Sequence, residues 1–476
     1  MTQVKQSPQE PRSGDGAATV EPAIQTLPEL PQLAPGVELS GKMGESGFKD
    51  EQWLAQRNGS FVQLTDLLYK VAEQANGQQT IEEMAASVSA SYGKKVSSDN
   101  IGQLLKQKLM PLGLVAGADG SVAAPQGTAG GAPARSPLAV NMKMALISPS
   151  TIDRCTRILQ TLFWTPILIA VLLAGAAVLG WLFFVHGIGN SVRNALYQPG
   201  LFLAALAVIV LAAAFHELGH ASALRRGGGK VRQMGFGIYL IYPAFYTDVS
   251  DNYRLGRWAR VRTDLGGFYF NLVFALIMMG LYLVTRFEFL LLVIVLIIFD
   301  IVRQLMPFVR LDGYWALADL TGIPDFFSHM GAFLRTVLPL PFWKGPKLPN
   351  LKTWVKFVYA AYILVTVPLL AFLLFTMVRT LPRLLATAWD SFGKLANQVS
   401  QAQAHGDALK MLVSVVQMLT LALPTLGTLF ILFTLGRTIV RLILNWSKPS
   451  RPRRVVGSLG MAAIVAFLAF LWAPHI

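Results

Sequence analysis

Residues 216–220 have the types and the spacing of a metal site that could activate water. The sequence His216-Glu217-Leu-Gly-His220 places two histidines four residues apart, so on a helix both imidazoles lie on one face. This spacing suits two ligands of one zinc ion, and Glu217 is placed to take a proton from zinc-bound water. The alternative is that His and Glu merely pair at a membrane interface. Because each ionisable residue in a span costs about 2.5–3.5 kcal/mol, three at one helix end favour a compensating metal.

A catalytic zinc ion needs a third protein ligand, and Asp312 is the candidate. It stands in Arg-Leu-Asp312-Gly313, just beyond a long apolar stretch. Asp-Gly is also ordinary turn chemistry, and without the HExxH sequence that interpretation would be preferred. The single cysteine, Cys155, excludes a thiolate-rich site, so histidines and carboxylates must supply the ligands. The weaker alternatives are Asp319, His329, Asp248 and Asp251, of which the last two are interpreted as loop or substrate-groove residues.

A third motif, Gly266-Gly267-Phe-Tyr-Phe-Asn271, opens another apolar stretch. Gly267 and Asn271 fall on one helical face, where they would allow a close approach to the histidine helix and place an amide inside the membrane. That amide could donate to the oxyanion of a tetrahedral intermediate or hold the substrate. Plain helix packing, with Asn271 bonded to a neighbouring backbone, is an equal alternative.

The elements that must position these residues are membrane helices. The chain has 476 residues, 53% hydrophobic and 14% charged, with a mean hydropathy of +0.49. Soluble domains carry about 25% charged residues, so a soluble enzyme is nearly excluded. Seven apolar stretches are long enough to cross about 30 Å of hydrocarbon. They lie near 162–185, 200–221, 266–285, 287–307, 354–378, 412–436 and 455–474.

Basic residues predict how the spans are oriented. The formal net charge is +15, and Lys and Arg concentrate in the connections after the second, fourth and sixth spans. By the positive-inside rule these connections and the N-terminus face the cytoplasm, and the C-terminus faces out. The second and fourth spans then run in the same direction, so His216, His220 and Asp312 all fall at cytoplasmic ends. Segment 379–410 is expected to be an interfacial amphipathic helix, with a re-entrant segment as the alternative.

The region before the first span predicts a small cytoplasmic domain. Residues 1–45 have the composition of a disordered tail, and 46–115 that of a winged-helix-like α+β domain. Its expected elements are a strand at Arg57–Leu64, a helix capped by Thr65, a second helix opened by the capping box Thr80-Ile-Glu-Glu83, a third over Ile101–Leu109, and a strand at Leu112–Val115. Residues 116–137 are expected to be a flexible linker, 138–330 a metal-binding membrane core, and 331–476 additional transmembrane helices.

The predicted fold class is therefore an all-α polytopic membrane protein of about seven transmembrane helices, with a small N-terminal α+β winged-helix-like cytoplasmic domain. The lipid bilayer is its expected surrounding. A DNA-binding winged helix is a competing interpretation. However, the lysines of 46–115 are balanced by acidic residues, so no nucleic-acid partner is expected.

Together the three motifs resemble the site-2 protease family of intramembrane zinc metalloproteases, and within it the bacterial branch of peptide zinc metalloproteases. The resemblance covers roughly 140–330. It implies Zn2+ held by His216, His220 and Asp312, Glu217 as general base and then acid, and Asn271, with Gly267 beside it, orienting the substrate. It implies hydrolysis of a peptide bond in a membrane-associated protein or peptide near the cytoplasmic face of a bacterial inner membrane. Two departures are the absence of a PDZ insertion between the third and fourth spans and Arg-Leu-Asp-Gly in place of Asn-Pro-Asp-Gly.

The N-terminal domain resembles the coenzyme PQQ biosynthesis protein D group, which implies that it binds a leader peptide. The segment Gly235–Tyr246 could form a hairpin that takes the substrate as an added strand, or a simple interfacial hairpin. The rival function is a non-hydrolytic membrane component of a peptide maturation, export or immunity system. The complete HExxH sequence argues against that rival, because a structural metal site does not require Glu217. A transporter is disfavoured because the last three spans lack charged midplane residues.

Overall fold

The computed structural model describes residues 27–473, except 44, 58–59, 123–139, 188–198, 240–241, 307–309, 324–325, 338–349 and 449. The chain divides into two units. One comprises Met1–Val37 with Asp66–Pro125, and the other comprises Glu38–Thr65 with Gln126–Ile476.

The first unit consists of short helices whose ends follow from their capping residues. They are α1 (Asp66–Gln74), α2 (Ile81–Tyr92) and α3 (Ser98–Leu104), which continues as a π-helical turn over Leu105–Leu109. The predicted capping box is confirmed: the Thr80 hydroxyl accepts from Glu83 N at 3.3 Å, and Thr80 N donates to the Glu83 carboxylate at 2.8 Å. The strand expected at 112–115 is reduced to one bridge between Val115 and Leu33.

A three-stranded sheet opens the second unit. Its strands are β1 (Val37–Lys42), β2 (Gln52–Arg57) and β3 (Ser60–Thr65), in the order β1-β2-β3. Two predictions need correction. The tail expected to be disordered through residue 45 contains β1, because pairing with a neighbouring strand supplies hydrogen bonds that the local composition does not reveal. The strand expected over 57–64 is β3, but it begins at Ser60, since Arg57 ends β2 opposite Ser60.

Six helices in the described part of the chain are long and apolar enough to cross a membrane. The seventh predicted span is α10 (Phe289–Leu305), whose 17 residues stand at the lower limit for crossing. The six are α5 (Thr165–Trp181, extended by a π-helical turn to His186), α7 (Pro199–Arg226), α9 (Gly266–Thr285), α13 (Thr353–Ala404), α14 (Ala408–Ser447) and α15 (Arg451–Trp472).

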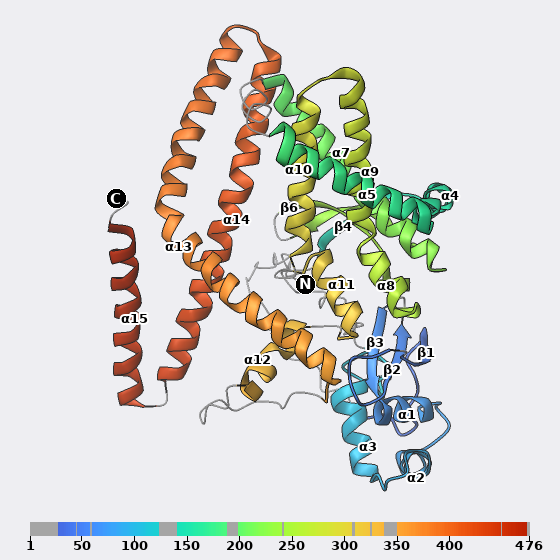
Figure 1. Cartoon of the computed structure of the whole chain (residues 1–476). Helices are drawn as coiled ribbons and strands as arrows, with labels where there is room; N and C mark the ends of the chain where they lie inside the picture. Colours follow the sequence, from blue (N-terminus) through green and yellow to red (C-terminus); the bar gives the residue numbers. More distant parts are fainter. Residues whose placement is uncertain are drawn as a thin grey trace, which may run out of the picture. The chain divides into compact units, whose positions relative to one another are not determined.

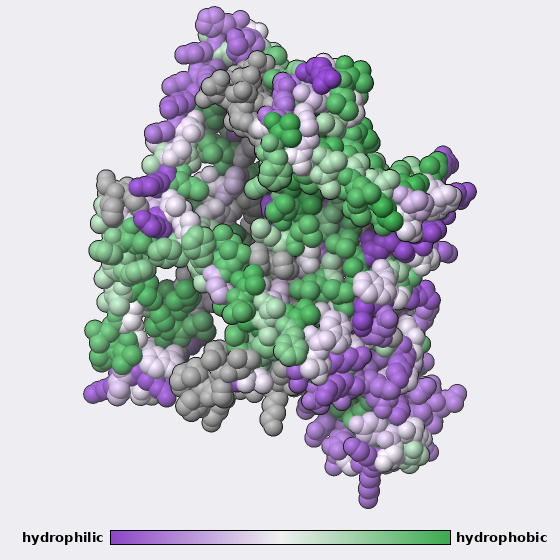
Figure 2. All heavy atoms as spheres, in the orientation of Figure 1, coloured by the Kyte–Doolittle hydropathy of each residue, from purple (hydrophilic) through white to green (hydrophobic). Residues whose placement is uncertain are grey.

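The helix α13 is longer than any bilayer requires. Its 52 residues span about 78 Å at 1.5 Å per residue, against about 30 Å of hydrocarbon. The segment at 379–404, expected to be a separate interfacial helix, instead continues α13, and Pro382 lies inside the helix without ending it. Helix α14 returns beside α13 (Figure 1). Figure 2 shows hydrophilic residues over the tip and the upper part of this hairpin and mostly apolar residues farther down.

The elements that build the candidate site surround α7 and α9. Helix α9 packs against α7, α5 and α10, and its buried residues Phe274, Met278 and Tyr282 share a core with Leu291 and Ile294 of α10. A second sheet has the order β4-β5-β6, and its β5–β6 pair confirms the hairpin expected at 235–246. The remaining elements are β4 (Val140–Ile147), α4 (Pro149–Leu159), β5 (Met234–Tyr239), β6 (Tyr242–Thr247), α8 (Arg257–Asp264), α11 (Asp312–Thr321) and α12 (Phe326–Val337).

Candidate metal centre

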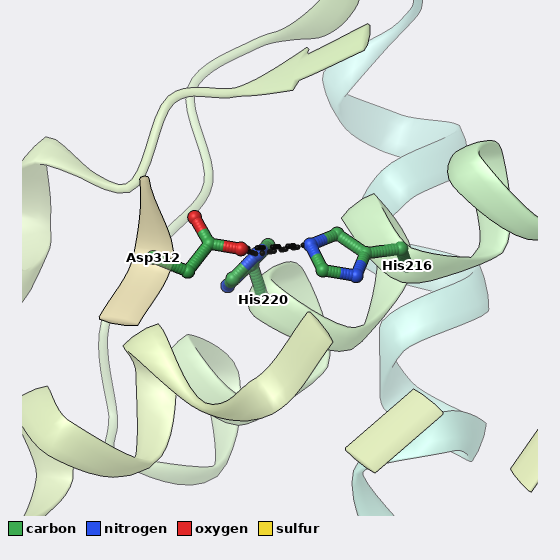
Figure 3. Close-up of side chains that lie close together, drawn as sticks. All are labelled: His216, His220 and Asp312. Atoms are coloured by element: carbon green, nitrogen blue, oxygen red, sulfur yellow. Dashed lines mark hydrogen bonds and ion pairs between the residues drawn. The ribbon is translucent and has the colours of Figure 1, made fainter. Parts of the chain in front are cut away.

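Three side chains from two helices converge on one point near the C-terminal end of α7. His216 and His220 come from successive turns of α7, and Asp312 is the first residue of α11 (Figure 3). The Asp312 Oδ2 atom lies 2.9 Å from His216 Nε2 and 3.2 Å from His220 Nε2. The two imidazole Nε2 atoms are 3.0 Å apart. The structure thus brings together the three residues that the sequence singled out as ligands.

The spacing of these three atoms fits a zinc ion. Ligand atoms at 2.0–2.1 Å in a tetrahedral zinc site lie about 3.3 Å from one another, close to the observed 2.9–3.2 Å. Both histidines are buried, with relative exposures of 5% and 8%. Two imidazoles and one carboxylate are also the ligand number of a catalytic zinc site, which keeps one position open.

A backbone carbonyl orients His220, and the neighbouring imidazoles lower the pKa of Asp312. The Nδ1–H of His220 donates to the Thr263 carbonyl of α8 at 2.8 Å, which orients the ring so that its Nε2 faces Asp312. Burial by itself raises the pKa of the Asp312 carboxyl, but the imidazoles of His220 and His216 outweigh it and hold that pKa well below its ordinary value. Asp312 is therefore a carboxylate, the form that a metal requires.

Glycines allow α9 to approach the histidine helix. A Cβ atom at Gly267 would lie 2.3 Å from His216 Nε2, and one at Gly219 would lie 2.3 Å from the Gly266 carbonyl oxygen. Gly267 therefore leaves room for a ligand side chain, a more direct role than the helix packing expected of it. Asn271 lies one turn farther along, buried, and its Oδ1 has no hydrogen-bond partner in the described part of the chain. The alternative in which Asn271 is bonded to a neighbouring backbone group is thus not realised through this oxygen among those residues.

Glu217 lies beside the two ligands on α7 and is half-buried. Its backbone carbonyl accepts a hydrogen bond of 3.1 Å from the hydroxyl of Thr247, the last residue of β6. Since β4 pairs with one side of β5 and β6 with the other, β6 is an outer strand of its sheet. The end of an outer strand is therefore fixed to the residue that the sequence marks as the base.

The weaker ligand candidates have other partners. Asp319 pairs with Arg260 at 3.2 Å and accepts from Asn252 at 3.2 Å. Asp248 accepts from Ser250 N, and Asp251 accepts from Lys230 N. The side chain of His329 lies outside the described residues.

Sequence reasoning missed the residues that support the ligands. Thr263 acts through its backbone carbonyl, which any residue type could supply, so no sequence signal marks it. Arg260 and Asp319 are both largely buried and join α8 to α11. Their pairing joins residues that are far apart in sequence, so no local pattern marks it. Gly219, inside the HExxH sequence, could have been recognised by the small-residue spacing typical of membrane helix contacts.

Comparisons with known proteins agree with this geometry. Residues 201–471, more than half of the chain and a range that includes all three converging residues, match the model of peptidase family M50. A protein of Bacillus subtilis (strain 168), named "Putative peptide zinc metalloprotease protein YydH", is 24% identical over 142 residues, which cover 29% of this chain and 55% of that protein. The chain thus spans about half the length of this relative. No solved structure matches the chain.

Proposed function

Since the chain belongs to peptidase family M50 and is a membrane zinc metalloprotease, we propose that it hydrolyses a peptide bond of a membrane-associated protein or peptide near the cytoplasmic face. The observation that carries this proposal is the convergence of His216, His220 and Asp312 beside Glu217 at the end of an apolar helix.

The roles of the residues follow from their chemistry. His216, His220 and Asp312 hold the metal, and the Thr263 carbonyl orients His220. A bound zinc ion supplies Lewis acidity, which polarises the peptide carbonyl and makes water acidic enough to ionise near neutral pH. Glu217 accepts the proton of the attacking water and passes it to the leaving amine. Asn271 has a buried amide with an unused oxygen, which supports its role in orienting the substrate.

The substrate reaches the site as an extended strand. A helical peptide hides its carbonyl groups in hydrogen bonds, so a local unwinding must precede hydrolysis. The outer strand β6 ends at Thr247, which is hydrogen-bonded to the Glu217 carbonyl, and this favours the binding of the unwound segment by strand addition over the simple interfacial hairpin.

The location and the leader peptide are further parts of the proposal. The distribution of Lys and Arg supports a cytoplasmic N-terminus in a bacterial inner membrane. The helices of the first unit and their capping box support the winged-helix-like domain, which we propose binds a leader peptide. The chain would then act in peptide maturation.

Replacing the proposed base tests hydrolysis separately from metal binding. Glu217→Gln keeps the shape of the side chain but cannot accept the proton. We expect it to retain zinc and to lose at least about 100-fold in the cleavage of model transmembrane peptides in vesicles. The matched control, Glu288→Gln, changes a carboxylate at the start of α10, where Tyr282 contacts it, and should cleave normally.

Two results would contradict the proposal. Unchanged cleavage by Glu217→Gln with zinc bound would favour the non-hydrolytic membrane component. An absence of zinc from the intact protein, compared with a His216→Ala variant, would contradict the metal site itself.

A further inference from the structure

The segment between β1 and β2 contacts helices of the second unit, to which it belongs. We call Glu45–Asp50 the β1–β2 loop. Its base is closed by a hydrogen bond of 2.8 Å from Met43 N to Gln52 O, so the loop projects from a paired hairpin. Glu45 adopts a left-handed backbone conformation, with φ of 59°, which is unfavourable for a residue other than glycine. Such a conformation persists only where surrounding contacts hold it.

The first of these contacts is with α8. The Glu45 carboxylate accepts a hydrogen bond of 2.9 Å from the backbone N–H of Arg257, the first residue of α8. The Arg257 guanidinium donates in return to the Glu45 carbonyl at 2.7 Å. The residue before α8, Gly256, has no side chain to cap it, so a carboxylate more than 200 residues away in sequence satisfies the helix N-terminus.

The second contact is with the C-terminal end of α11. Gly47 N donates to the Gly322 carbonyl at 3.3 Å, and a Cβ at Gly47 would lie 2.2 Å from the Thr321 carbonyl oxygen. Gly322 is itself left-handed, with φ of 68°. The loop backbone and the helix end therefore meet with no space for a side chain.

The third contact is Phe48, which enters the core behind α11. Its side chain is buried with Tyr314 of α11, Ile323, and Tyr359 of α13. On either side of Phe48, Lys49 N donates to Asn350 O at 2.6 Å and Gly47 O accepts from Lys352 N at 3.0 Å. The loop is therefore packed and hydrogen-bonded as an integral part of this core.

The loop contacts one end of α8 and one end of α11. The opposite ends of these two helices lie at the candidate metal centre. Helix α8 begins at Arg257 and carries Thr263, whose carbonyl orients His220. Helix α11 ends at the loop and begins with Asp312. Between the two ends, Arg260 and Asp319 join the helices by a largely buried ion pair.

We propose that Glu45 and Phe48 are positioning residues of the metal centre: they fix the remote ends of α8 and α11 and so set the Thr263 carbonyl and Asp312 relative to the histidines. This proposal rests on the proposed function, because it assigns the metal to His216, His220 and Asp312. It makes the N-terminal sheet a structural part of the peptidase rather than a domain attached to it.

The test measures the metal site rather than hydrolysis. Zinc affinity is determined by chelator competition on the full chain, and the visible spectrum of the Co2+-substituted protein reports the ligand geometry. We expect Phe48→Ala to weaken zinc binding by about tenfold and to alter the cobalt spectrum, as is typical when support of a ligand is lost. Phe48→Leu, which keeps an apolar side chain in the core, should restore most of the affinity.

Glu45→Ala provides a second variant that leaves the core intact. It removes the cap of α8 and should weaken zinc binding severalfold. Its matched control is Glu51→Ala, which removes an exposed carboxylate paired with Lys42 in the same hairpin and should bind zinc normally. If Phe48→Ala does not fold, the difference in zinc affinity between Glu45→Ala and Glu51→Ala tests the positioning role by itself.

The outcomes separate the two proposals. Wild-type affinity and an unchanged cobalt spectrum in Phe48→Ala and Glu45→Ala, with zinc bound by the wild-type protein, would overturn the positioning role and leave the proposed function standing. A wild-type protein that binds no zinc would overturn the proposed function, and the positioning role with it.

Discussion

Helix α9, which packs against the histidine helix α7, and the C-terminal helices α14 and α15 bury very different shares of their apolar stretches. Half of the most apolar stretch of α9 is buried in the protein, whereas for α14 and α15 the share is 6%. Backbones touch at Gly219 and Gly266, but the surroundings of Gly436 and Gly460 are open. Similar apolar compositions therefore accompany close packing in α9 and largely uncovered surfaces in α14 and α15.

The sharpest test of this difference is a single methyl group at the site. Gly267→Ala would place a carbon 2.3 Å from His216 Nε2, so the imidazole must move and zinc binding should fall by up to about 100-fold. Gly280→Ala makes the same change on the same helix, where nothing lies within 4 Å, and should bind zinc normally. Equal zinc affinities of the two variants, measured by chelator competition, would contradict the close packing.

A second test compares a buried ion pair with an exposed one. Arg260→Met leaves Asp319 without its partner between α8 and α11, and should lower the free energy of unfolding by about 3–5 kcal/mol. Arg303→Met breaks the exposed pair with Asp300 on α10 and should cost less than about 1 kcal/mol. Denaturant unfolding in detergent measures both, and similar losses would show that burial of the pair is irrelevant.

A third test uses pH. Burial and the neighbouring Asp319 raise the pKa of the Asp264 carboxyl. Protonation therefore favours the folded state: this contribution is full below the unfolded pKa near 4 and is lost as pH rises toward the folded pKa. Asp264→Asn cannot ionise, so we expect its Tm to exceed that of the wild type at pH 7 and to approach it near pH 3.

The control for the pH test is Asp153, whose replacement should change the Tm in the opposite direction. Hydrogen bonds from Arg225 and Arg157 lower the pKa of the exposed Asp153, whose contribution to stability is present above pH 4 and is lost as pH falls through the folded pKa. Asp153→Asn should therefore have a lower Tm than the wild type at pH 7. A rise in Tm for both variants would show that the two carboxyls do not differ as described.

The smallest effect is expected from the C-terminus. A chain that ends at Ser447 lacks α15, which packs against α14 and α13. Its zinc affinity should stay within about twofold of that of the full chain, since distant and independent sites do not couple. A tenfold loss in the chelator assay would mean that the C-terminal helices also shape the metal centre.

Local patterns predicted the parts of the fold that depend on neighbours in sequence. The four-residue spacing placed His216 and His220 on one face, and the capping box at Thr80 placed the start of α2. The alternation of spans indicated that Asp312 lies at the same depth as the histidines, and the structure brings them together. Their roles as ligands, and that of Glu217 as the base, stay predictions.

The missed features depend on pairing between distant segments. The capping of α8 by Glu45 and the insertion of Phe48 behind α11 have no local signal, because each joins residues more than 200 positions apart. The composition of residues 1–45 predicts a disordered tail, but part of it forms β1. Pairing with a neighbouring strand, which the local composition does not reveal, makes this segment a strand. The length of α13 is also not predicted. The helix continues past Pro382, a residue type that usually ends or kinks a helix.

The separation of the ligands along the chain has a consequence for biosynthesis. Asp312 follows His220 by 92 residues. While the ribosome is translating this interval, the nascent chain already carries His216, Glu217 and His220 but not Asp312. The three side chains therefore cannot come together before α10 and the start of α11 have been made.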